Sequence, residues 1–277
     1  MGLTINYPIT RINSNMLEDL IAAITWDPNP EIFHLEFLNR GPRWYGLLFA
    51  TGFYLAYLVS RRMFKKEDLE EDLLDKAFLY IFVGTLVGAR LGHVFFYQWD
   101  YYQNHLIEIP MIWKGGLASH GAAIAIMIAL WMNSRNVTKR PVLWIIDRAT
   151  LGESLAGAFI RLGNLMNSEI YGKPTDLPLA SIFVRDDPPP RHPTQIYEAL
   201  AYLLVFAVLA HLFFKTKSRH RLGLLSGVFF IGVFGFRILI EFLKENQVPF
   251  EETLPLNMGQ ILSIPLVFLG VLLLVRA

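Results

Sequence analysis

Seven stretches of mainly apolar residues, separated by polar segments, make up most of this chain of 277 residues. A helix that crosses a bilayer needs about 20 consecutive, mostly apolar residues. The stretches are residues 44–60, 77–99, 115–132, 141–164, 196–214, 222–243 and 256–275. The first is short, and Asp147, Arg148 and Glu153 interrupt the fourth. Because the strict alternation of a barrel strand is absent, we expect an all-α integral membrane protein with seven transmembrane helices.

The composition supports this fold class and removes several kinds of chemistry. Hydrophobic residues make up 53% of the chain and charged residues 18%, whereas about a quarter of a soluble domain is charged. The net charge of +1 gives no reason to expect a nucleic-acid partner. Because the chain has no cysteine, disulfides, thiolate metal sites and a cysteine nucleophile are excluded. We expect neither a cofactor nor a metal.

Basic residues in the connections predict how the chain is oriented in the membrane. One set of loops (61–76, 133–140, 215–221 and the C-terminal tail) holds 13 Lys and Arg in about 35 residues. The opposite set (1–43, 100–114, 165–195 and 244–255) holds 8 in about 100 residues. Cytoplasmic loops carry the excess of positive charge. The N-terminus is therefore expected outside and the C-terminus in the cytoplasm.

The expected outer side carries the longer connections of what we take to be one membrane domain, residues 1–277. Residues 1–43 form an N-terminal arm in this interpretation, with a short amphipathic helix at 16–24 on the membrane surface. Residues 165–195 form a head insertion that is too long and too rich in proline for a plain turn. Loops of that length are usually functional.

Charged and polar residues inside the stretches are expected to gather at one depth. At about 1.5 Å per residue, Arg90 and Arg237 lie roughly 20 Å and roughly 22 Å above the inner face. Arg161 is near the outer end of its stretch, and Tyr45 opens the first. His120 lies roughly 8 Å below the outer face. Since intramembrane charges are costly and usually functional, we expect a cation-rich cavity that opens toward the outer leaflet.

Arginines in such a cavity suit a phosphate ligand, because guanidinium offers a planar fork of donors. Lipid head groups are the commonest phosphates at that depth, so a phospholipid-handling site is favoured over a channel. Each residue also has a purely structural interpretation. Arg237 and Glu241 are four residues apart and can pair on one helix face. His120 can be a core histidine bonded to a carbonyl, and Gly115, Gly116 and Gly121 either allow close helix packing or leave room for a ligand.

Other catalytic motifs are missing. There is no HExxH, so a metalloprotease is not expected. There is also no GxSxG, and Ser119 directly precedes His120, so the two cannot face each other on a helix. In residues 160–172, Asn164 lies on the helix face of Arg161, and its amide suits either a ligand or the helix end. Any nucleophile should therefore come from the substrate.

Five segments closely resemble one family: GGLASHGAAI, RLGNLMNSEIYG, RHPTQIYEAL, FRILIEFLKENQ and MGQILSIP. In this order they are similar to the prolipoprotein diacylglyceryl transferases of bacterial inner membranes. The resemblance runs from about residue 41 to the C-terminus. It implies a seven-helix enzyme with a periplasmic head and a site on the periplasmic side. The implied reaction moves diacylglyceryl from phosphatidylglycerol to the lipobox cysteine of a preprolipoprotein, forming a thioether and releasing glycerol phosphate.

The resemblance also implies roles for individual residues. Arg161 matches the arginine that binds phosphatidylglycerol, and His120 matches a histidine often assigned as a base. The other residues that match functional positions are Tyr45, Asn164, Glu169, Gly172, Arg237 and Glu241. We expect Arg161 and Arg237 to hold the phosphate and Glu241 to orient Arg237. The thiol is activated either by His120 as a base or by an arginine that lowers the pKa of the thiol. Arg90 is added as a substrate-binding residue from its depth alone.

Two positions differ from the family, and other function classes remain possible from the residues alone. Val233 stands where relatives often carry a tyrosine, four residues before Arg237, and Tyr171 stands where some have tryptophan. A transporter would use the same arginines as a transient anion site, but it would need a polar path on the inner side and usually shows an internal repeat. A membrane scaffold would need no gathered cations.

Overall fold

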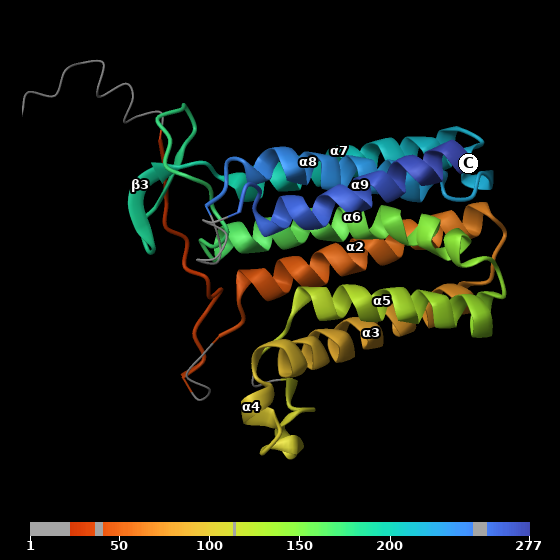
Figure 1. Cartoon of the computed structure of the whole chain (residues 1–277), viewed down its shortest axis with the longest axis horizontal. Coiled ribbons are helices and arrows are strands. Elements are labelled where there is room, and N and C mark those ends of the chain that lie inside the picture. The colour runs from red at the N-terminus through yellow and green to blue at the C-terminus, as the bar shows by residue number, and fades with distance from the viewer. Residues whose placement is uncertain (1–22, 37–40, 113–114, 246–253) are drawn as a thin grey trace, which may run out of the picture.

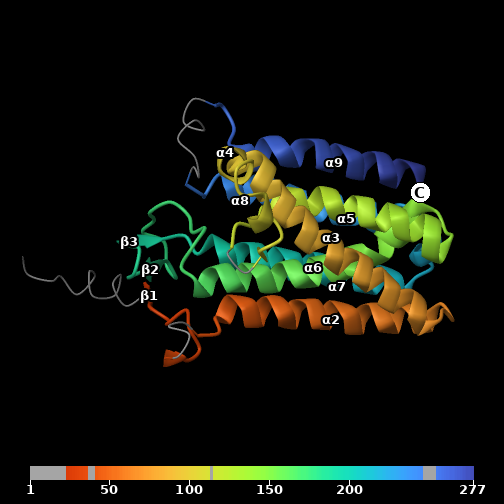
Figure 2. The same ribbon diagram turned by 90° about the horizontal axis from the view of Figure 1, so that it is seen from below.

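The structure is a bundle of long helices with a small sheet at one end. This computed structural model describes residues 23–36, 41–112, 115–245 and 254–277. In these residues, seven helices of 15 to 27 residues run roughly parallel or antiparallel (Figures 1 and 2). They are α2 (Trp44–Lys66), α3 (Glu71–Tyr97), α5 (Ser119–Asn133), α6 (Val142–Met166), α7 (Thr194–Lys215), α8 (Leu224–Glu241) and α9 (Met258–Arg276). Each expected stretch overlaps one of them.

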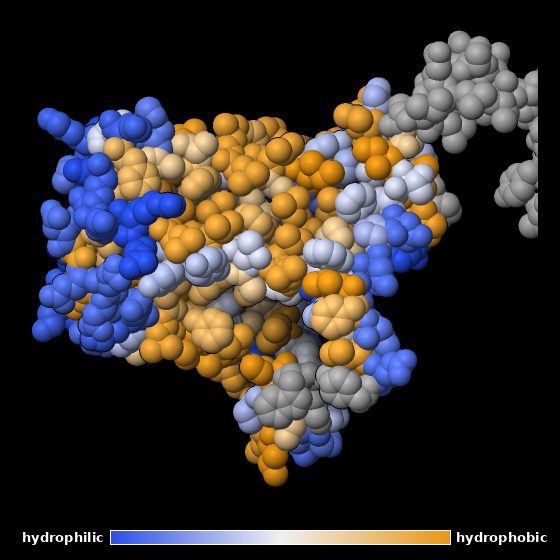
Figure 3. Space-filling view, turned by 180° about the vertical axis from the view of Figure 1, so that it is seen from behind, coloured by the Kyte–Doolittle hydropathy of each residue, from blue (hydrophilic) through white to orange (hydrophobic). Residues whose placement is uncertain are grey.

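The outside of the bundle is apolar, as in a protein that lies in a bilayer. Four of the described helices are long and apolar enough to cross a membrane: α3, α7, α8 and α9. Large hydrophobic side chains such as Leu79, Ile124 and Leu204 are more than half exposed. Figure 3 shows a broad hydrophobic surface between two hydrophilic ends. Soluble proteins rarely expose so large an apolar surface to water. The chain is therefore a mostly helical, multi-pass membrane protein.

The predicted all-α fold is correct for the bundle but incomplete at one end. Three short strands, β1 (Ile24–Trp26), β2 (Ser181–Phe183) and β3 (Asp187–Arg191), form a sheet in the order β1-β2-β3. β1 runs parallel to β2, and β3 runs antiparallel to it. β3 has three successive prolines, which lack a donor and suit an edge strand. We call the end of the bundle beside this sheet the head end.

The sheet joins the two segments that the sequence analysis assigned to an arm and a head. β1 belongs to the N-terminal arm, whereas β2 and β3 belong to the insertion 165–195. Trp26 also donates its indole N–H to the carbonyl of Leu165 at 2.8 Å, so the arm is attached to the end of α6. The amphipathic helix expected at 16–24 lies mostly outside the described residues, and Ile24 begins β1 instead of ending that helix.

Short segments of α-, 3₁₀- and π-helix lie in the connections between the long helices. After α3, α4 (Trp99–Tyr102) and η2 (Leu106–Glu108) project from the bundle at the head end (Figure 1). At the opposite end, η4 (Ser134–Thr138) is a π-helical turn after α5, and η5 (Ser218–His220) connects α7 to α8. The first described residues and the end of α9 therefore lie at opposite ends of the bundle (Figure 1).

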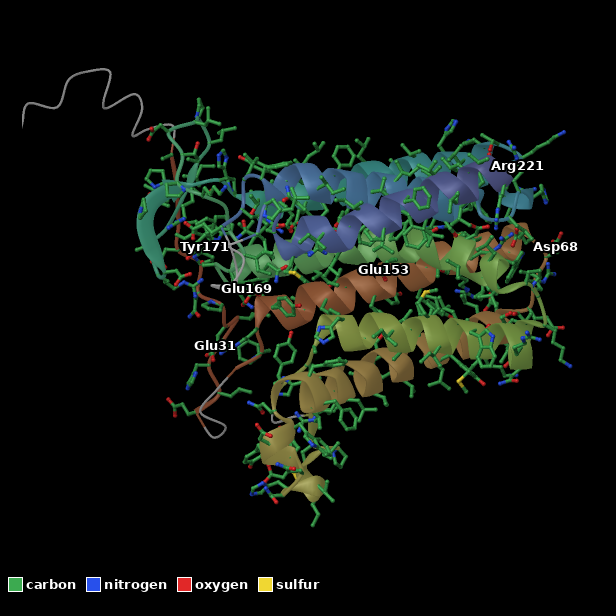
Figure 4. All side chains as sticks on the ribbon, in the orientation of Figure 1. Glu31, Asp68, Glu153, Glu169, Tyr171 and Arg221 are labelled. Carbon is green, nitrogen blue, oxygen red and sulfur yellow. The ribbon has the colours of Figure 1, made fainter. Side chains whose placement is uncertain are left out.

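Two buried charges hold the helices together at the end opposite the sheet. Asp147 of α6 accepts the backbone N–H groups of Gly223 and Ser226 at 2.8 Å each, so it caps the start of α8. Arg148 donates two hydrogen bonds to the carboxylate of Glu67 at the end of α2. Buried charges are tolerated when they are paired and hydrogen-bonded in this way. The charges that interrupt the fourth stretch thus have structural partners, except Glu153, whose side chain is exposed halfway along α6 (Figure 4).

Glycine allows α3 and α5 to pack closely. Gly84, Gly88 and Gly92 recur every four residues on the α3 face that meets Gly121 and Ala125 of α5. A Cβ added at Gly88 would lie 2.2 Å from the Cβ of Ala125 and 2.5 Å from the carbonyl oxygen of Gly121. Small residues are common where membrane helices approach closely. For Gly121, the packing interpretation from the sequence is therefore supported.

We predict that Gly88→Ala destabilises the protein, because the added methyl group forces α3 and α5 apart. Overpacking of this kind costs about 1–3 kcal/mol, measurable as a lower midpoint of thermal unfolding in detergent. Gly235→Ala is the matched control, since a Cβ there meets nothing within 4 Å. Equal unfolding midpoints for Gly88→Ala and the unsubstituted protein would contradict this account of the helix pair.

Candidate functional site

Five charged side chains form a continuous series of ion pairs at the head end. Arg161 Nε of α6 lies 3.2 Å from Glu198 Oε2 of α7. The other Glu198 oxygen, Oε1, lies 2.9 Å from Lys244 Nζ, which follows α8. Lys244 Nζ is also 3.1 Å from Glu241 Oε1, and that oxygen is 3.4 Å from Arg237 Nε. We call this series, which links α6, α7 and α8, the ion-pair chain.

The middle of the ion-pair chain is more deeply buried than its ends. The side chains of Glu198 and Lys244 are 1% and 2% exposed, whereas that of Arg237 is 32% exposed. Arg161 and Arg237 stand at the two ends, so three positive charges alternate with two negative ones. The excess positive charge is located at the arginines. An anionic group that approaches either arginine would meet a guanidinium group that is already paired with a carboxylate.

Both terminal arginines have an unused donor. The Nε atoms of Arg161 and Arg237 are buried, yet neither makes a hydrogen bond of acceptable geometry with another described residue. Each is close enough to its glutamate for Coulomb attraction, but not aligned with it. Buried donors in native proteins nearly always have an acceptor. The missing acceptor at both arginines is consistent with a ligand that supplies oxygen atoms.

A cluster of amides and one carboxylate adjoins Arg161. Asn164 Oδ1 accepts from Arg161 Nη1 at 3.4 Å, and Asn164 Nδ2 donates to Glu169 Oε1 at 2.7 Å. Asn167 donates to the same oxygen at 3.3 Å. Gln195 at the start of α7 donates to the backbone carbonyl of Glu169 at 2.7 Å. The turn after α6 is thus fixed by side chains from two helices, and Figure 4 shows Glu169 at this end of the bundle.

The conformation of this turn needs such support. Ser168 and Ile170, on either side of Glu169, both have positive φ, 57° and 61°. A residue with a side chain rarely adopts this conformation, and strained residues of this kind gather at functional sites. The hydrogen bonds to Glu169 hold the turn in place, and with it the side chains of Asn164 and Asn167.

Tyr45 and Gly172 border this region through close packing. A Cβ on Gly163 would lie 2.8 Å from Cδ2 of Tyr45, so the ring of Tyr45 fills the space beside α6. A Cβ on Gly172 would lie within 2.8 Å of Leu243, His192 and Thr194. Gly172 also donates its N–H to the carbonyl of His192 at 2.9 Å. Only glycine fits where these segments meet. Burial lowers the pKa of the His192 imidazole.

Arg90 lies at the same end but serves another structure. Its guanidinium donates to the backbone carbonyls of Glu108, Ile109 and Gly115 at 2.6–2.8 Å. The guanidinium also lies 4.9 Å from the centre of the Tyr102 ring. Arg90 is 2% exposed and holds the connection between α3 and α5 in place. None of its described contacts is to the ion-pair chain, so its predicted substrate-binding role has no geometric support.

His120 lies at the start of α5, on the helix pair formed by α3 and α5. Its ring is exposed. The centre of the ring lies 5.2 Å from the centre of the Phe96 ring, in an edge-on contact, and 5.6 Å from the centre of the Tyr97 ring, in a tilted contact. Within the described residues its ring makes no hydrogen bond to a backbone carbonyl, which a core histidine would make. It also makes no described contact with the ion-pair chain. The sequence-based interpretation as a base therefore remains a prediction.

Comparison with known proteins gives the family. A sequence profile described as "Prolipoprotein diacylglyceryl transferase" matches residues 30–276. The chain belongs to the prolipoprotein diacylglyceryl transferase family. A relative from Porphyromonas gingivalis, named phosphatidylglycerol--prolipoprotein diacylglyceryl transferase, is 45% identical over 93% of this chain and 96% of its own length. Relatives with the same name from Chloroherpeton thalassium and Bacteroides fragilis are 44% and 42% identical, over 94% and 92% of this chain and 96% and 95% of their own lengths.

The resemblance found in the motifs is therefore confirmed, and the structure shows which family positions meet. It brings Arg161, Asn164 and Glu169 into one hydrogen-bonded cluster, and Arg237 and Glu241 into the ion-pair chain. The structural interpretation of Arg237 is supported by its ion pair with Glu241, and the phosphate-binding interpretation stays a prediction.

The sequence analysis assigned no role to Lys244 or Glu198. The spacing contains a signal for Lys244: positions 237, 241 and 244 fall on one helix face. Glu198 falls in the first turns of α7, where the sequence RHPTQIYE begins the helix. A helix start explains that segment well enough to hide a second role. Only the crossing of α7 with the end of α8 brings the carboxylate to Lys244.

We predict that Lys244→Met strongly destabilises the protein, because it leaves the buried carboxylates of Glu198 and Glu241 without their shared cation. Removing one partner of a buried ion pair costs roughly 3–5 kcal/mol. Lys244→Arg keeps the charge and should recover most of that loss. Unfolding in detergent measures both variants. Lys173→Met, at an exposed lysine of the same end, is the control, and equal stability of Lys244→Met and this control would refute the proposed role.

Proposed function

We propose that this protein transfers the diacylglyceryl group of phosphatidylglycerol to the thiol of a preprolipoprotein lipobox cysteine. It would act in the bacterial inner membrane with its head end toward the periplasm. Family membership supports the reaction. The observation that carries it in this chain is the pair of arginines at the ends of the ion-pair chain, each with a buried, unused N–H donor.

The arginines suit the phosphate of phosphatidylglycerol. Guanidinium donors bind phosphate oxygens through charge-assisted hydrogen bonds, which are about twice as strong as neutral ones. Glu198 and Glu241 hold the two guanidinium groups from the buried side. Such preorganised donors cost no rearrangement when charge grows on a leaving group. Asn164 and Tyr45 border Arg161 and are placed to contact the glycerol of the head group.

The chemistry requires one bond to form and one to break. The cysteine sulfur attacks the glycerol carbon that carries the phosphate, forming the C–S bond of the thioether. The C–O bond to the phosphate breaks, and glycerol phosphate leaves with the electron pair. The thiol proton passes to a base, for which His120 is the candidate. Arg161 and Arg237 stabilise the negative charge that gathers on the departing phosphate.

The membrane topology belongs to the same proposal. All seven long helices cross the bilayer, with the N-terminus periplasmic and the C-terminus cytoplasmic. Four helices, α3, α7, α8 and α9, are long and apolar enough to cross a membrane. The helices α2, α5 and α6 run alongside them (Figure 2). The basic residues of 61–76 and 215–221 lie at the end opposite the sheet, as the excess of cytoplasmic positive charge requires.

We predict that Arg161→Gln and Arg237→Gln each lower kcat about 100-fold to 1,000-fold, because each removes a donor to the leaving phosphate. Detergent-purified protein is incubated with phosphatidylglycerol and a lipobox peptide, and the thioether product is measured by mass spectrometry. Arg43→Gln removes an exposed arginine at the same end and should keep full activity. Peptide left unmodified by the unsubstituted protein, or full turnover by Arg161→Gln, would overturn the proposed function.

We predict that His120→Gln lowers kcat/KM and changes the pH dependence of the rate, because it removes the candidate general base. Because His120 is exposed and packs against two rings, the variant should unfold at the same temperature as the unsubstituted protein. Near-normal turnover with an unchanged pH profile would remove the base role and leave the family assignment intact.

A further inference from the structure

A polar pocket lies at the end of the bundle opposite the sheet. Its volume is about 500 Å³, and it opens between the end of α2, the start of α6 and the connection from α7 to α8. Its lining residues are Lys66, Glu67, Asp68, Arg140, Trp144, Arg148, Arg219, His220 and Leu222. Figure 4 places Asp68 at this end, far from Glu169 of the head end. The pocket is therefore separate from the ion-pair chain.

One tryptophan at the pocket holds two arginines. The guanidinium of Arg140 lies 4.7 Å from the centre of the Trp144 ring, and that of Arg148 lies 4.2 Å from it. Trp144 is only 6% exposed, so its ring is a fixed surface. Stacking fixes the plane of a guanidinium and leaves its N–H fork available for a planar acceptor.

The two arginines differ in what their donors do. Arg148 bonds the carboxylate of Glu67 and the backbone carbonyls of Trp144 and Arg219. Among the residues that the structure describes, none accepts a hydrogen bond from the exposed side chain of Arg140. Arg140 is thus oriented by Trp144, while its donors remain free for a ligand.

The charge of the pocket is positive after its internal pairs are counted. Glu67 neutralises Arg148, which leaves Lys66, Arg140 and Arg219 against Asp68. The N-terminus of the 25-residue helix α6 begins beside Arg140, and the partial positive charge of a helix start favours the same ligand. Leu222 and the Trp144 ring supply the apolar part of the pocket lining.

We propose that this pocket binds the phosphate of an anionic lipid head group. The hydrophilic end of the bundle opposite the sheet borders the broad hydrophobic surface (Figure 3), and such a boundary is the level of lipid phosphates. Arg140 supplies a stacked fork, and Lys66 and Arg219 supply point charges, a combination typical of basic head-group pockets between membrane helices. This site is independent of the proposed function, because it shares no residue with the ion-pair chain.

Native mass spectrometry of the detergent-purified full chain tests the site, with cardiolipin as probe and phosphatidylcholine as the neutral comparison. Each cation near a phosphate contributes about fivefold to affinity. Arg140→Gln with Arg219→Gln should therefore weaken one cardiolipin-binding event about 25-fold. Lys66→Gln removes an exposed cation without touching Trp144, and should weaken the same event about fivefold. The matched control, Arg135→Gln with Lys215→Gln, removes two exposed charges from the same end outside the pocket.

Three results separate the possibilities. Loss of one bound cardiolipin in the pocket variants, but not in the control, supports the site. Equal binding by the pocket variants and the control overturns it, because bulk charge then explains the attraction. Inorganic phosphate is added in a competition arm: phosphate that binds in the pocket while cardiolipin does not overturns the lipid assignment. Transferase activity of the pocket variants with saturating phosphatidylglycerol should be unchanged. The binding result therefore tests the pocket alone, and the activity result tests the proposed function.

Discussion

The ammonium group of Lys244 between two buried carboxylates is the interaction on which the site depends. Charges within a membrane protein are stable only where they are paired or meet water. Glu198 and Glu241 are two buried carboxylates that share one cation, and removing the partner of a buried charge is strongly destabilising. Lys244 pairs with both. The second oxygen of Glu198 faces Arg161, whereas in Glu241 one oxygen faces both Lys244 and Arg237. The positions of Arg161 and Arg237 follow from this arrangement, although the two residues belong to different helices.

The same arrangement explains how a lipid phosphate can be held without being held too tightly. An arginine fully hydrogen-bonded by carboxylates has little to offer a ligand, as Arg148 shows at the opposite end. Arg161 and Arg237 are attracted by their glutamates but are not aligned with them, so a donor stays unused on each. The protein thus uses similar residue types in two ways. Arg148 and Glu67 join helices, and the ion-pair chain prepares a binding surface.

Much of the fold and part of the site could be predicted from the sequence. Apolar stretches give helix positions directly, and counting residues along each stretch gives depth, which placed Arg161 and Arg237 at one level. Depth does not give the rotation of a helix or the path of a loop. Arg90 was expected at nearly the same depth as Arg237, but its guanidinium donates to the carbonyls of the connection after α3. The sheet was missed because β1 pairs with β2 across more than 150 residues, and three-residue strands leave no pattern in the sequence.

Val233 shows how a difference from the family can be read in the packing. Relatives often carry a tyrosine at this position, and this chain has a valine 5% exposed in the buried cluster that also holds Tyr202. The ring of Tyr202, on α7, packs against Gly157 of α6 and lies 5.9 Å from the guanidinium carbon of Arg161. A bulky tyrosine at 233 would compete for the same interior, because close-packed cores do not accept added volume without displacement. An aromatic neighbour of the Arg161 guanidinium thus comes from α7, and Val233 belongs to the same buried cluster as that ring.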